Sequence, residues 1–299
     1  MLRLIRPRVF RFGLSMVVAI TCLAGLFSVQ PVVAQSEPLM LYLRVVDGEG
    51  TPVLDLLPAE VVIQQGGQSC EIVEMQGEPD GMKIAVLVDT NAPAQFLNPY
   101  RDGLLAFFDG LPDGHEVGVF TIAGQTMQRV EFTRDHTELT EFAEDIFMDP
   151  RGTVMLDGLA ETWRTRFDED DAWPVIVMVL HDGPDSSSLG GDENQRTVTE
   201  IMQRGGTIHS LVFASGRMDQ MTQVSRNVVQ NTGGVHMRIE LANALEESLG
   251  DLANQISAHY ANFGNSYRVV IQCEAEGDVG VGVGRAGTSF TAFGSRRVD

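Results

Sequence analysis

The residues that could take part in chemistry are spread over three segments of the chain. Asp89 ends the apolar run Ile84–Val88, Asp182 ends a second apolar run, and Thr153 stands where a helix is predicted to begin. In a doubly wound sheet, ligands bind outside the carboxyl ends of the strands, where the strand order reverses. We therefore expect Asp89 and Asp182 to flank one crevice. The question is whether Asp89 belongs to a metal site.

A hydrolytic site is an alternative chemistry at the second of these strand ends. His181 and Asp182 stand near Ser186, and these are the residue types of a nucleophilic triad. No GxSxG elbow is present to expose the serine, and no second acid is evidently placed to orient the histidine. We expect the protein not to be an enzyme and keep a secreted hydrolase using His181 and Ser186 as the alternative.

Other motifs give little support to a cofactor. Residues 282–287 fit GxGxxG, but only twelve residues follow Gly287, which leaves no room for a βαβ unit. We expect a glycine-rich edge strand there. The sequence contains no Walker-type phosphate loop. The remaining histidines lack metal-ligand spacing: His115, His136, His209, His236 and His259.

Alternating strands and helices must position the crevice residues. The predicted strands are 84–89, 116–122, 126–132, 174–181, 207–213 and 234–239. The predicted helices are 95–110, 137–147, 154–167, 192–204, 217–231 and 240–260. This alternation predicts an α/β fold with a doubly wound, mostly parallel sheet and helices on both faces.

Segments of β structure flank this region on both sides. Residues 35–80 contain apolar-alternating arms, including two around Gly66 and Gly67, and residues 265–299 return to strand alternation. We expect the two segments to pair into one small β lobe beside an α/β domain over residues 83–262.

Residues 1–34 have the features of a secretory signal peptide. Four arginines and no acid precede the apolar stretch 14–29, and Val32 and Ala34 are the small residues of a cleavage site. We predict cleavage after Ala34 and export to the periplasm or outside the cell, with no membrane insertion afterwards. An uncleaved anchor is the alternative, although the stretch is short for a span of about 20 residues.

Cleavage changes the charge and the cysteine count. The net charge falls from −20 to −24, because four arginines leave with the peptide. A surface this acidic repels phosphate backbones and anionic lipids, so we expect no nucleic-acid partner. Cys70 and Cys273 remain, and in an oxidising compartment they are candidates for one disulfide, with two free thiols as the alternative. A disulfide would join the two flanking β segments.

The order of these segments resembles a von Willebrand factor A (VWA) domain, in the version of secreted bacterial proteins with a β segment before and after the domain. The matching segments are VVDGEGTPVLDLLPAEVVIQQGGQ, IAVLVDT, RGTVMLDGLAE, VIVMVLHDGPD, GGTIHSLVF and NTGGVHMRI. They span nearly all of the mature chain. The resemblance implies the doubly wound fold and the binding of another protein.

The resemblance also implies a metal-ion-dependent adhesion site, in which Asp-x-Ser-x-Ser, a threonine and a further aspartate hold one divalent cation. Asp89, Thr153 and Asp182 match this pattern, whereas Asn91 and Pro93 replace the serines. Asn91 can offer an amide oxygen, so Mg²⁺ or Mn²⁺ held by Asp89, Asn91, Thr153 and Asp182 is one hypothesis. Because Pro93 has no side-chain oxygen, we favour a degenerate site in which Asp89 accepts backbone hydrogen bonds.

The sequence thus predicts an exported, non-enzymatic module of VWA type that binds an unidentified protein, in adhesion or at the cell envelope. A structural subunit of an envelope complex is the other interpretation, and a stable co-purifying partner would distinguish it from transient adhesion.

Overall fold

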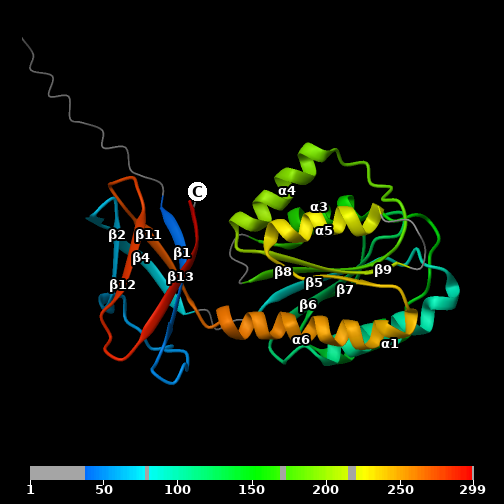
Figure 1. Ribbon diagram of the computed structural model, residues 1–299, viewed down its shortest axis with the longest axis horizontal. Coiled ribbons are helices and arrows are strands. Elements are labelled where there is room, and N and C mark those ends of the chain that lie inside the picture. Colours follow the sequence, from blue (N-terminus) through cyan, green and yellow to red (C-terminus); the bar gives the residue numbers. More distant parts are fainter. Residues whose placement is uncertain (1–37, 78–80, 169–172, 215–219, 298–299) are drawn as a thin grey trace, which may run out of the picture. The chain divides into compact units, whose positions relative to one another are not determined.

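The computed structural model describes residues 38–77, 81–168, 173–214 and 220–297. The predicted signal peptide, residues 1–34, lies outside these ranges. Within them, no helix combines the length and the apolar character needed to cross a membrane. The described residues form a six-stranded sheet covered by helices and, from the two ends of the chain, two smaller antiparallel sheets (Figure 1).

The six-stranded sheet has the order β10-β9-β8-β5-β6-β7. Its strands are β5 (Lys83–Val88), β6 (Glu116–Thr121), β7 (Met127–Thr133), β8 (Pro174–His181), β9 (Thr207–Phe213) and β10 (His236–Ile239). All neighbours are parallel except β7, which runs antiparallel to β6. Within this sheet, β5 comes first in the chain. The next two strands, β6 and β7, lie on one side of it, and β8, β9 and β10 lie on the other. The strand order therefore reverses between β5 and β8, which are followed by Asp89 and Asp182.

Helices cover both faces of this sheet. They are α1 (Leu97–Asp109), α2 (His136–Asp145), α3 (Met155–Arg166), α4 (Gly191–Gln203), α5 (Gln220–Thr232) and α6 (Leu245–Phe263), with short 3₁₀ turns at Ala94–Phe96 (η2) and Ala242–Ala244 (η3). Figure 1 shows α1 and α6 on one face and α3, α4 and α5 on the other. The predicted fold class is confirmed.

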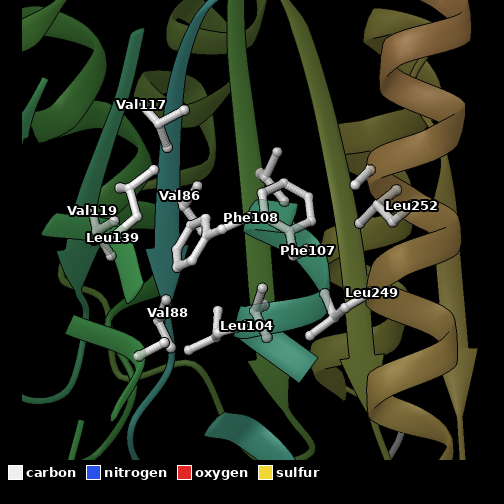
Figure 2. Packing of buried hydrophobic residues seen from close by; sticks show 14 of the residues in the cluster. Val86, Val88, Leu104, Phe107, Phe108, Val117, Val119, Leu139, Leu249 and Leu252 are labelled. Atoms are coloured by element: carbon white, nitrogen blue, oxygen red, sulfur yellow. The ribbon is translucent and has the colours of Figure 1, made fainter. Parts of the chain in front are cut away.

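Strand β5 shows why the sheet must be covered on both faces. Ile84, Val86 and Val88 belong to the apolar cluster under α1, α2 and α6, whereas Ala85 and Leu87 belong to the cluster under α3, α4 and α5. Successive side chains of a strand point to opposite faces, so an unbroken apolar run buries both. Figure 2 shows Val86 and Val88 beside side chains of α1, with Leu249 and Leu252 of α6 nearby. Each fully buried large side chain contributes about 1.5–3 kcal/mol of transfer free energy.

One helix is shorter than predicted, with a consequence for the surface. The helix predicted over 137–147 ends at Asp145, because Ile146 is extended with φ −57° and ψ 143°. The Ile146 side chain is buried, and its carbonyl accepts a hydrogen bond from Arg101 Nη2 at 3.1 Å. Phe147 therefore lies outside the helix.

The segments at the two ends of the chain pair with each other. One sheet has the order β13-β1-β11-β4 and the other β12-β2-β3. The strands are β1 (Leu39–Val46), β2 (Val61–Gln65), β3 (Gln68–Ser69), β4 (Glu71–Gly77), β11 (Tyr267–Gln272), β12 (Val279–Val283) and β13 (Ser289–Arg297), and a 3₁₀ turn, η1, spans Pro58–Glu60. Leu41, Leu43, Ile63, Val269 and Ile271 are buried in one apolar cluster of these strands. The expected β lobe is present.

A disulfide joins Cys70 to Cys273, as predicted, and links residues 203 positions apart in the chain. The two arms predicted around Gly66 and Gly67 are present, but they do not pair with each other along their length. Only the two-residue β3 pairs with β2, and after Cys70 the chain enters the other sheet as β4, because β4 pairs with β11 instead.

The glycine-rich segment at residues 282–287 is not a nucleotide loop. It begins in β12, which lies at the edge of its sheet, and β13 follows it rather than a helix.

Candidate functional site

Asp89 lies at the carboxyl end of β5 and is fully buried, with 0% of its surface exposed. Its Oδ1 accepts a hydrogen bond from the Asn91 backbone N–H at 2.9 Å. Its Oδ2 accepts one from Thr153 Oγ1 at 2.8 Å and one from the His181 backbone N–H at 3.2 Å. Three donors from three separate segments therefore converge on one carboxyl group.

The electrostatics of this carboxyl group reflect two opposed effects. Burial raises the pKa of Asp89 to about 6, although the three hydrogen bonds favour the ionised form and act in the other direction. The Tyr100 hydroxyl is also fully buried, and burial together with the charge of Asp89 raises its pKa. The Tyr100 hydroxyl has no hydrogen-bond partner among the described residues. Asp89 is thus surrounded by apolar groups that disfavour its ionised form, and its three hydrogen-bond donors among the described residues favour that form.

The other predicted ligands close to Asp89 are engaged with each other. Thr153 is 2% exposed and donates its hydroxyl hydrogen to Asp89, while the Asn91 amide Nδ2 donates to Thr153 Oγ1 at 3.4 Å. In this arrangement the Thr153 hydroxyl links the Asn91 amide to the Asp89 carboxyl group. A cation at this place would have to displace hydrogen bonds that already exist.

The remaining two positions of the metal pattern do not complete a ligand set. Pro93 is exposed, contributes no side-chain oxygen and stands at the start of η2. Asp182 is 9% exposed, its backbone N–H donates to the Phe213 carbonyl at 2.9 Å, and its Oδ1 has no partner within the described ranges. No group of three or more His, Cys, Asp or Glu side chains among the described residues is arranged to hold a metal. The adhesion-site pattern needs only two acids, so the misfit lies in the missing oxygen: with proline at position 93, the remaining side chains offer fewer ligands than the six oxygens that Mg²⁺ prefers.

His181 and Ser186, the residues of the alternative hydrolytic site, contact aromatic rings and the start of α3 respectively. The His181 ring lies beside the rings of Phe96 and Phe213, with centroids 6.2 Å and 5.7 Å away. Burial lowers the pKa of His181, partly offset by the charge of Asp182. The Ser186 backbone N–H donates to the Thr153 carbonyl at 2.7 Å, which holds the loop after β8 against the start of α3.

A second network, centred on Asp185, was not identified from the sequence. Asp185 Oδ1 accepts from the Met155 N–H at 2.9 Å and from Ser187 Oγ at 2.7 Å, so a residue from a distant loop caps the N-terminus of α3. Ser187 Oγ accepts in turn from the Asp157 N–H at 3.0 Å, and Asp157 accepts from the Ser188 and Leu189 N–H groups. These bonds fasten the loop after β8 to the first turn of α3.

Comparisons with known proteins match the fold at low sequence identity. No protein-family model matches the chain, and no curated protein matches it. Among solved structures, the chain is similar to an aerotolerance-related membrane protein from Bacteroides fragilis, at 16% identity over 58% of this chain and 100% of that one, with a TM-score of 0.46. It is similar to BatB from Bacteroides thetaiotaomicron, at 14% identity over 60% and 100%, with a TM-score of 0.47.

A third similar structure is von Willebrand factor type A from Catenulispora acidiphila. The identity is 12%, and the match covers 88% of this chain and 74% of that one, with a TM-score of 0.47. At these values, the fold assignment rests on the strand order and helix placement of this chain itself.

Proposed function

We propose that the chain is an exported, non-enzymatic binding module of VWA type that recognises another protein without a metal ion, through the rim of the crevice between β5 and β8. The observation that carries this proposal is the mutual hydrogen bonding of Asp89, Asn91 and Thr153, together with the proline at position 93. The crevice keeps the position used for ligands in doubly wound sheets, and its loops can recognise a protein surface.

Export is part of this proposal. The features of residues 1–34 and the disulfide support it, because disulfides persist in oxidising compartments. We propose no reaction for this site. The His181 ring lies beside two phenylalanine rings, and the Asp89 carboxyl group accepts hydrogen bonds from residues that hold the surrounding loops.

Site-specific photo-crosslinking tests the rim. A photoreactive residue replaces the exposed Gln95, in η2 after Asp89, or the exposed Gln195, in α4, as a matched control. We expect Gln95 to form an adduct with one protein of the cell envelope, equally with and without EDTA, and Gln195 to form none. An adduct that EDTA abolishes would contradict the metal-free mode, and adducts at Gln195 alone would place the binding surface elsewhere.

A further inference from the structure

A groove runs between the edge strand β7 and helix α2, next to the crevice. It consists of two adjoining hollows of about 250 Å³ and 470 Å³ that share Arg129, Phe142 and Asp145. The smaller hollow reaches Thr90, the residue after Asp89, and the larger follows β7 and α2. We call this feature the β7–α2 groove. Through Thr90 the groove is continuous with the rim proposed above, and all of its lining residues lie in the described range 81–168.

The apolar end of the groove is formed by a firmly held segment. Ile146 is buried, its carbonyl accepts from Arg101, and the Asp149 N–H donates to the Thr90 carbonyl at 2.8 Å. Between these anchors, Phe147 is 55% exposed. Met127, at the start of β7, is 36% exposed and lines the same hollow. Phe147 and Met127 therefore form a contiguous apolar surface within one hollow, and such patches mark interaction sites more often than scattered single residues do.

The charged groups around the groove are of one dominant sign. The larger hollow is lined by four acids, Glu131, Glu138, Glu141 and Asp145, and by a single cation, Arg129. The Arg129 guanidinium carbon lies 5.5 Å from the centre of the Phe147 ring. Glu138, Glu141 and Asp145 are exposed and form no ion pair with any residue in the described ranges. In the smaller hollow two cations, Arg129 and Arg151, stand against two acids, Asp145 and Asp149, and Arg151 is paired with Asp149 at 2.5 Å, so the excess of acids lies in the larger hollow.

We propose that the β7–α2 groove binds a basic segment of a partner protein that carries one large apolar side chain. The apolar side chain enters the hollow beside Phe147 and Met127, and lysine or arginine side chains pair with Glu138, Glu141 and Asp145. The net charge of −24 after cleavage attracts a cationic partner and repels an anionic one. This inference rests on the proposed function, because it names the partner chemistry of the same rim.

The experiment uses the mature chain and a displayed library of random dodecapeptides. We expect the enriched peptides to combine lysine or arginine with one large apolar residue. Their affinity should fall roughly tenfold or more on Phe147→Ala, as for an aromatic hot spot. The double change Glu138→Lys with Glu141→Lys should weaken binding to a similar extent, and raising the salt concentration should weaken binding to the wild type.

Matched variants separate the groove from general effects. Phe290→Ala removes another exposed phenylalanine, on β13, and Glu246→Lys with Glu247→Lys reverses two exposed acids on α6. These variants should change affinity by less than about twofold, because surface substitutions away from a binding site have small effects. Enrichment of acidic peptides, failure to enrich any peptide, or equal loss in the control variants would overturn the inference.

The two proposals fail in different ways. If Gln95 forms its adduct but no basic peptide binds the groove, rim recognition stands and the partner chemistry assigned here is wrong. If neither occurs, both proposals fall.

Discussion

The buried site around Asp89 and the β7–α2 groove adjoin each other at Thr90, but they use their polar groups in opposite ways. In the crevice, Asp89, Asn91 and Thr153 direct their hydrogen bonds inward and to each other. In the groove, Glu138, Glu141 and Phe147 remain exposed. The difference separates residues that hold the fold from residues available to a partner. Substitutions in the crevice should therefore change stability, and substitutions in the groove should change binding.

The largest expected effect is the pH dependence that Asp89 contributes. Its pKa is about 6 in the folded protein and about 3.9 in an unfolded chain. The folded state therefore binds the proton more tightly. The stabilisation from this proton is complete below about pH 4 and is lost as the pH rises through 6, by about 3 kcal/mol.

Urea unfolding of the wild type and of Asp89→Asn at pH 4 and pH 7 measures this effect, since the variant cannot titrate at this position. Between pH 4 and pH 7, the unfolding free energy of the wild type should fall by about 3 kcal/mol more than that of Asp89→Asn. A difference that stays constant with pH would show that the Asp89 carboxyl is not desolvated as described.

A smaller loss is expected for Thr153→Val. The change keeps the side-chain shape but removes the shortest hydrogen bond to Asp89, at 2.8 Å, and leaves a buried oxygen less satisfied. The unfolding free energy at pH 7 should fall by about 2 kcal/mol. Thr165→Val, at an exposed position of α3, is the control and should change it by less than about 0.5 kcal/mol. Equal effects of the two changes would argue against a special role for the Thr153 hydroxyl.

Removal of Asp185, which caps the N-terminus of α3, should lower the unfolding free energy by less than Thr153→Val does. Asp185→Ala frees the Met155 and Leu156 N–H groups and should lower stability by about 1 kcal/mol. Hydrogen exchange followed by NMR should show faster exchange at these two amides, with little change in α5. Unchanged exchange at Met155 would mean that α3 does not depend on this contact.

The smallest effect is expected from divalent cations. If the crevice binds no ion, 5 mM Mg²⁺ or Mn²⁺ should change the unfolding free energy by less than about 0.3 kcal/mol, because ligand stabilisation vanishes when the Kd far exceeds the concentration. The double change Asn91→Ser with Pro93→Ser restores both hydroxyl groups of the family pattern and should make stability depend on the cation. Saturable binding of Mg²⁺ to the wild type in calorimetry, lost on Asp89→Ala, would contradict the metal-free interpretation.

The fold was predictable because its signals are local. Unbroken apolar runs such as Ile84–Val88 specify strands covered on both faces, and helical segments between them leave few alternative topologies. The place of the candidate site was predictable to the same extent, since Asp89 and Asp182 follow the two strands on either side of the reversal in strand order.

The detailed site was not predictable, because its contacts are remote in sequence. The donors to Asp89 include Thr153 and His181, which are 64 and 92 residues away, and the acid that caps Met155 is 30 residues away. No local pattern encodes such pairs. The groove was hidden for another reason. Helical periodicity predicted a helix through residue 147, whereas the backbone becomes extended at Ile146, so α2 ends at Asp145 and Phe147 lies on the surface.

Along the chain, the disulfide spans the whole six-stranded sheet and its helices, since β5 to β10 and α1 to α6 all lie between Cys70 and Cys273. A protease that cuts one loop in that interval produces two fragments that remain covalently joined, so nicked protein separates only after reduction. Strand β1 lies between β11 and β13. A chain exported from its N-terminus therefore delivers β1 early, but both of its neighbours, β11 and β13, arrive last, so β1 can complete its pairing only after β5 to β10 have emerged.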